Sequence, residues 1–178
     1  ANHFESMQQA LQANDLKAAR AAGSALIDGY EGSPYAVRAA MQLARLNMES
    51  QDLKSAKAQL EWVTKHTSEA AYRDVARLNL SAILLDEKQY APALEQLNAS
   101  HSEAFAPRFD DLKGDILLAI VSMEVEEVVE AGRAVVAAPP ADVAKALDQL
   151  IRIYFDHSLQ YLSKALWRTP VALSIEAS

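Results

Sequence analysis

DLKAA at residues 15–19, DLKSA at residues 52–56 and QYAPA at residues 89–93 are three versions of one motif, spaced 37 residues apart. Each copy stands where one helix is expected to end and the next to begin. Internal similarity at a period of roughly 34 residues is typical of stacked helical hairpins, because a single hairpin cannot bury its apolar face alone. The motif therefore predicts an all-α solenoid of antiparallel helix pairs.

Helical periodicity surrounds the second copy of the motif. Pro34 suits the first turn of a helix, and apolar side chains then recur at spacings of four, three and four from Val37 to Met48. After a polar turn at residues 50–52, the same period continues on a second helix. Residues 70–88 and 90–97 repeat this arrangement.

A small residue closes each copy of the motif, and it has a packing reason: helices that cross closely need a side chain no larger than a methyl group. These residues are Ala19, Ala56 and Ala93. An ordinary helical bundle with an alanine-rich sequence is the alternative. Large residues at positions 16, 53 and 90 keep the same step, which favours the repeat.

The overall composition limits the possible partners. Apolar residues make up 51% of the chain while the mean hydropathy is near zero, so apolar and polar residues must be interleaved as in amphipathic helices. The net charge of −7, with scattered basic residues, argues against a nucleic-acid partner. The absence of cysteine excludes thiol catalysis, cysteine-ligated zinc and disulfides.

Candidate catalytic and metal-binding groups are weak. The four histidines, at positions 3, 66, 101 and 157, share no metal-ligand spacing. Asp110, Asp111 and Asp115 are close in sequence, but neither a glycine-rich loop nor a nucleophile–base pair is nearby, so we interpret them as solvated helix charges. The sequence therefore predicts no enzyme, no metal site and no cofactor.

The repeat pattern resembles the tetratricopeptide repeat. Three of its positions recur at the 37-residue step: a small first-helix residue, a small second-helix residue and a large apolar residue. They are Ala44 and Ser81, Ala56 and Ala93, and Leu60 and Leu97. The tryptophan found near the start of such repeats is missing, which makes these copies degenerate.

A more specific resemblance covers residues 1 to about 119. ARLNL at 76–80, KQY at 88–90 and DLKGDILL at 111–118 resemble the YfgM-like proteins. The resemblance implies a bacterial inner-membrane protein whose periplasmic repeat domain associates with the Sec translocon and a periplasmic folding factor, with a link to envelope stress. The resemblance also implies an N-terminal membrane anchor, which would lie upstream of Ala1, because the chain itself offers no run of ~18 apolar residues for a membrane helix. A cytoplasmic location is the alternative.

The C-terminal third departs from that family. After Ala119 a turn and an alanine-rich helix are expected, but residues 121–130 are rich in valine and glutamate. We therefore predict a repeat array over residues 1–121, with about three and a half helix pairs, and a helical extension over residues 122–178. In this extension Pro139-Pro140 break the helix and Asp142 opens a long helix to Leu166, followed by a loose tail. That helix either caps the last repeat or pairs with another subunit.

Surface recognition remains as the function. The first helices of a solenoid line a groove, and the predicted protein-binding positions are Arg38, Met41, Arg45, Met48, Val75, Leu78, Ala82 and Leu85. Methionine offers an adaptable apolar surface, although Leu78 and Leu85 would equally suit the core between repeats. The predicted partners are translocon components, a periplasmic folding factor or unfolded clients. A soluble scaffold in a stress-regulatory or assembly complex, without chaperone activity, is the alternative.

Overall fold

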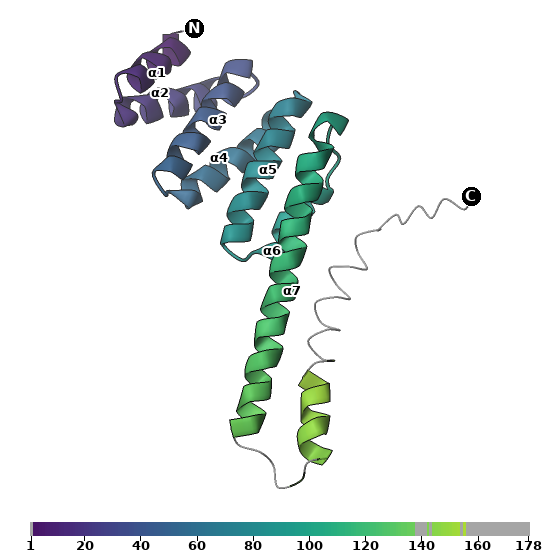
Figure 1. Ribbon diagram of the computed structural model, residues 1–178. Coiled ribbons are helices and arrows are strands. Elements are labelled where there is room, and N and C mark those ends of the chain that lie inside the picture. Colours follow the sequence, from purple (N-terminus) through teal and green to yellow (C-terminus); the bar gives the residue numbers. More distant parts are fainter. Residues whose placement is uncertain (1, 138–141, 143, 154, 156–178) are drawn as a thin grey trace, which may run out of the picture. The chain divides into compact units, whose positions relative to one another are not determined.

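The chain forms successive antiparallel helix pairs, as the repeat predicts (Figure 1). The computed structural model describes residues 2–137, 142, 144–153 and 155, and all regular structure in this part is helical. The three pairs are α1 (Asn2–Gln12) with α2 (Leu16–Gly29), α3 (Pro34–Glu49) with α4 (Leu53–His66), and α5 (Ala70–Asp86) with α6 (Tyr90–Asn98). A short 3-10 helix, η1 (Glu103–Phe105), precedes α7 (Ala106–Ala137). The predicted all-α repeat fold is confirmed.

The turn inside each pair explains the 37-residue step. Asn14, Gln51 and Lys88 lie 37 residues apart and all adopt the left-handed conformation, with φ of 56°, 60° and 59°. The N–H after each one donates to a carbonyl five residues back, at 2.8, 2.8 and 2.7 Å, and the turn residue's own N–H donates three residues back. This pair of bonds is the Schellman motif, which satisfies the last carbonyls of a helix. The same C-terminal motif therefore ends α1, α3 and α5.

The residue after each turn begins the next helix. The side chains of Asp15 and Asp52 accept the backbone N–H groups of Ala18 and Ser55 at 3.0 and 3.1 Å, which caps α2 and α4. Gln89 occupies the same position before α6 and makes no such cap bond. The third copy of the motif thus keeps the turn and loses the cap.

Small residues at the helix crossings confirm the packing prediction. Ala19, Ala56 and Ala93 are each completely buried. Leu60 and Leu97, one helical turn further on, are also buried, but the first repeat has Gly23 at this position. The side chain of Leu43 from α3 lies against Gly23, so a residue of the next helix takes the space that a leucine would need.

The chain divides into two compact units, Ala1–Lys113 and Gly114–Ser178. Helix α7 continues without interruption through residues 121–130, where the sequence suggests an incomplete repeat. The β-branched valines do not prevent it, because each valine costs only about 0.5 kcal/mol relative to alanine in a helix. The boundary after residue 121 stays a prediction.

Residues 144–153 form the described part of the predicted C-terminal helix. Asp142 precedes it, and its side chain accepts the N–H of Ala144 at 2.9 Å, as expected of a cap. A Cβ atom at Gly132 of α7 would lie 3.7 Å from Leu150, so the two helices of this unit touch there. Pro139-Pro140, the helix end near Leu166 and the tail lie outside the described residues.

Candidate protein-binding surface

The eight predicted binding residues lie on two first helices of the repeat unit. Helix α3 carries Arg38, Met41, Arg45 and Met48, and helix α5 carries Val75, Leu78, Ala82 and Leu85. We call these eight residues the first-helix face.

Partial exposure distinguishes this face from the core. All six of its apolar side chains are half-buried, while both arginines are exposed. The core side of α3 is different, since Ala36, Ala40 and Leu43 are almost completely buried. Leu78 and Leu85 are therefore not fully buried core residues, and they remain accessible in part to a partner. Binding by this face is still a prediction.

Neighbouring first helices are joined directly. The side-chain amide of Gln8 on α1 donates to the side-chain oxygen of Gln42 on α3 at 2.8 Å. This bond fixes the spacing of α1 and α3 next to Met41. The bond could not be predicted from the sequence, because the two glutamines lie 34 residues apart and are not equivalent positions of the 37-residue repeat.

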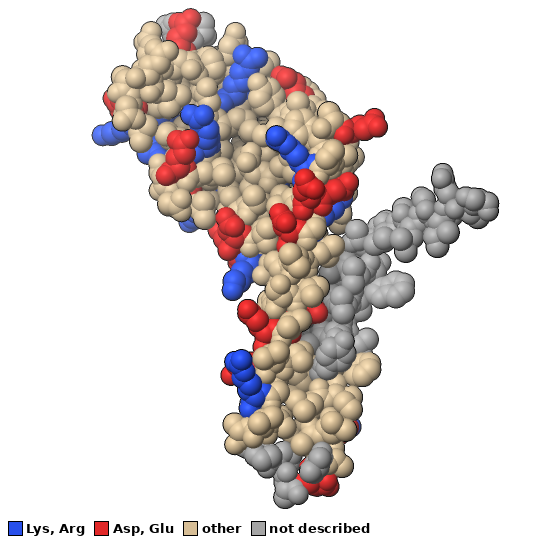
Figure 2. Space-filling view, in the orientation of Figure 1, with Lys and Arg blue, Asp and Glu red and all other residues tan. Residues whose placement is uncertain are grey.

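The two arginines of this face are exposed to solvent. Arg45 pairs with Glu49 one turn along α3 at 3.4 Å, with 79% and 59% of the two side chains exposed, so the pair adds little stability. Arg38 forms no ion pair with any residue in the described part of the chain. In Figure 2, basic and acidic side chains are interspersed over the visible side of residues 2–113 without a large area of one sign. The arginines can therefore steer an approaching acidic or polar segment without being held by the fold.

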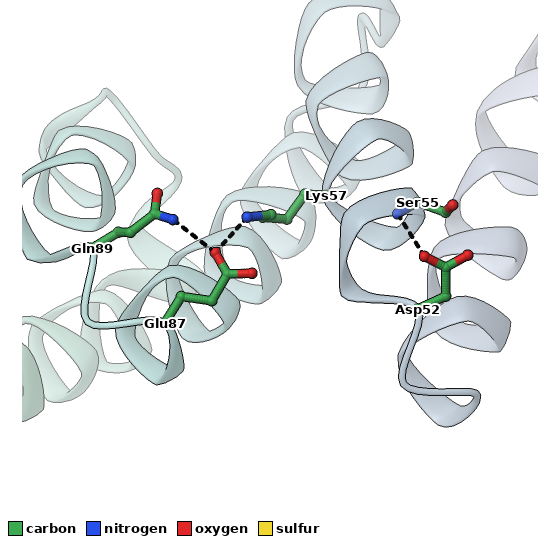
Figure 3. A network of polar contacts seen from close by, with 5 residues as sticks. All are labelled: Asp52, Ser55, Lys57, Glu87 and Gln89. Carbon is green, nitrogen blue, oxygen red and sulfur yellow. Dashed lines mark hydrogen bonds and ion pairs between the residues drawn. The ribbon is translucent and has the colours of Figure 1, made fainter.

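A polar network stabilises the turns between helices (Figure 3). Lys57 on α4 forms an ion pair with Glu87 at the end of α5, and Glu87 also accepts the Gln89 side-chain amide at 2.9 Å. In the neighbouring turn, hydrogen bonding by Ser55, through its side chain and its N–H, lowers the pKa of Asp52, with smaller contributions from Arg20 and Lys54. These contacts hold α4, α5 and α6 in register.

A buried carboxylate fixes the start of α5. Asp74 is 1% exposed and accepts the backbone N–H and the hydroxyl of Ser102 at 2.9 and 2.6 Å. Arg77, one turn along, donates to the carbonyl of Ser100, and burial lowers the pKa of its guanidinium, as does nearby Arg73. Together these bonds hold the segment after α6 against α5, beside Val75 and Leu78. Asp74 could not be predicted from the sequence, because its neighbours carry no pattern that marks a buried acid.

No group of three or more histidine, aspartate or glutamate side chains in the described residues could hold a metal ion. None of the helices in the described ranges is both long and apolar enough to cross a membrane.

Comparison with known families agrees with this architecture. The sequence profile of the tetratricopeptide repeat-like domain matches residues 1–157. The chain belongs to the tetratricopeptide repeat-like family. Its members serve as scaffolds for protein–protein interaction, and the repeat turns and half-buried first-helix face fit that role.

One curated relative of this tetratricopeptide repeat-like chain is the ancillary SecYEG translocon subunit of Neisseria gonorrhoeae, strain FA 1090. It is 28% identical over 127 residues, which covers 71% of the chain and 60% of the relative. The chain thus spans somewhat more than half the length of that protein. No solved structure matches the chain.

Proposed function

We propose that this chain is a non-catalytic scaffold that associates with the Sec translocon at the periplasmic face of the bacterial inner membrane and binds client or partner polypeptides. The observation that carries the binding role is the first-helix face, where six half-buried apolar side chains lie beside two exposed arginines. The named role of the Neisseria gonorrhoeae relative supports the translocon association.

Binding on this face follows from its chemistry. Half-buried side chains lose their remaining water contact when a partner covers them, at about 25 cal/mol for each Å² of apolar area. Met41 and Met48 are flexible and polarizable, so they adapt to partner segments of different shape. The arginines mainly change the encounter rate and the salt dependence, since exposed charges add little affinity.

The test is binding of a labelled, permanently unfolded polypeptide, such as reduced and carboxymethylated α-lactalbumin, by fluorescence anisotropy. Replacing Met41 and Met48 together with serine should weaken binding several-fold, while circular dichroism shows unchanged helix content. Replacing Arg38 and Arg45 with glutamine should mainly flatten the salt dependence.

A matched control removes exposed apolar area elsewhere. Val125 and Val129 on α7 are 56% and 46% exposed, and their double serine variant should bind like the parent. If the methionine variant is folded and binds like the parent as well, the first-helix face is not the working surface.

The translocon association needs a separate experiment in intact membranes. A photo-crosslinking residue in place of Met48, within the full-length protein, should give crosslinks to translocon components or to a folding factor. The same residue in place of Val125 is the control. Crosslinks at neither position would contradict the association.

A further inference from the structure

A hollow of about 490 Å³ lies between the second helices α2 and α4. Its lining residues are Ile27, Asp28, Glu31, Ala58, Gln59 and Trp62. We call it the acidic hollow, because two of these residues are carboxylates and none is basic. It lies on different helices from the first-helix face, so the proposed function does not use it.

The two carboxylates stand where the backbone already carries negative partial charge. Asp28 lies in the last turn of α2, Glu31 follows two residues after the helix end, and α2 has no basic residue in its last turn. Acidic groups at a helix C-terminus are unfavourable, whereas a cation there is stabilised. Asp28 has no hydrogen bond or ion pair within the described residues. A cation bound at the C-terminal end of α2 would therefore be stabilised by both the helix dipole and these carboxylates.

An aromatic ring is held in place beside the carboxylates. The imidazole of His66 stacks on Trp62, with ring centroids 4.4 Å apart and planes 13° from parallel. One nitrogen of His66 lies 2.8 Å from the carbonyl of Trp62, and the other lies 2.7 Å from Glu31 Oε1. Both partners are oxygen acceptors, so the ring bridges the carbonyl of Trp62 and the carboxylate of Glu31. His66 thus positions both the indole and the carboxylate that line the hollow.

The hollow is also lined by a residue whose side-chain oxygen lacks a hydrogen-bond donor. The side-chain oxygen Oε1 of Gln59 is buried and accepts no hydrogen bond. A buried polar atom without a partner costs free energy, about 1–3 kcal/mol, and such atoms are rare in folded proteins. Because Gln59 lines the hollow, a rotation of its side-chain amide would present this oxygen to a ligand with several N–H groups.

We infer that the acidic hollow binds the guanidinium group of an arginine on a partner polypeptide. Guanidinium is a planar cation with five N–H donors, which matches carboxylates, a carbonyl acceptor and an indole ring at one place. Asp28 and Glu31 pair with its charge, Gln59 accepts one N–H, and Trp62 contacts its plane. The chain would then hold a basic segment on its second helices independently of the apolar contacts on its first helices.

The probe is the tripeptide acetyl-Gly-Arg-Gly-amide, with the citrulline peptide as its uncharged isostere. Titrations are followed by ¹H–¹⁵N correlation spectra of the whole chain. We expect saturable shifts at residues 27–31 and 58–62 and at the Trp62 indole N–H with the arginine peptide alone. The double variant Asp28→Asn/Glu31→Gln should weaken binding about tenfold, and Trp62→Leu about fivefold.

The matched control is Glu95→Gln/Glu103→Gln, which removes the same charge from exposed acids of the same unit. It should bind the arginine peptide like the parent, as should the Met41/Met48 serine variant. Equal shifts with the citrulline peptide would overturn the inference. So would equal weakening by the two charge variants, because that would show only a general attraction to an acidic chain.

Discussion

Gly23 provides a quantitative test of the packing between α2 and α3. A Cβ atom added at Gly23 would lie 2.9 Å from Cδ1, 3.0 Å from Cγ and 3.2 Å from Cδ2 of Leu43. Leu43 is 2% exposed, so its side chain has little space to move away. Overpacking of this kind costs about 1–3 kcal/mol, while alanine in a helix is favoured over glycine by about 0.5–1 kcal/mol. We expect Gly23→Ala to lower the free energy of unfolding by about 0.5–2 kcal/mol.

The assay is urea denaturation followed by circular dichroism. Gly114→Ala is the matched control: Gly114 is an exposed helical residue with no atom within 4 Å of an added Cβ, so its substitution should stabilise by about 0.5–1 kcal/mol. Leu43→Ala removes all three crowded atoms. In a double-mutant cycle, Gly23→Ala should therefore cost less stability in the Leu43→Ala variant than in the parent. The reasoning is refuted if Gly23→Ala stabilises as much as Gly114→Ala, or if the cycle shows no coupling.

Three other predictions test separate parts of the fold. Asp74→Ala should lower the free energy of unfolding by about 1.5–3 kcal/mol, because it leaves the Ser102 N–H without its charged acceptor; Ser102→Ala, which keeps that N–H bond, should cost less in the same urea assay. The folded pKa of Asp52 is lowered, so its stabilising contribution is present above about pH 4 and is lost as the pH falls through the folded value. The stability difference between the parent and Asp52→Asn should shrink accordingly in acid titrations. Deleting residues 139–178 uncovers apolar surface on α7 and should cause aggregation, measured by light scattering; a monomeric product with the parent's melting temperature would contradict it.

The repeat was predictable because short segments of a few neighbouring residues determine its turns. A turn residue with positive φ recurs at positions 14, 51 and 88, a capping aspartate follows the first two, and the alanines behind them keep the same step. These features depend on a few neighbouring residues, so the sequence alone specifies them. The half-buried state of the first-helix face also follows from helical periodicity, which places Met41 and Met48 beside the core side of α3.

Other features depend on residues that are distant in sequence. The uninterrupted course of α7 could not be predicted, because valine-rich segments suit helices and strands alike and the surroundings decide. Asp74 gave no signal, since its partner Ser102 lies 28 residues away on a segment with no repeat equivalent. The glycine at position 23 likewise depends on Leu43, a residue of the next helix whose side chain lies against it.

The two proposed surfaces differ in the kind of segment that each can hold. The first-helix face combines apolar side chains with arginines, so it favours apolar segments with acidic or polar flanks. The acidic hollow on the second helices favours arginine, which the first-helix face repels through Arg38 and Arg45. A partner that carries both kinds of segment would engage two sites whose affinities are linked through its own chain, and its binding would be tighter than either site alone provides. Because the two sites respond oppositely to the charge of the ligand, peptides of opposite charge separate their contributions without any change in the protein.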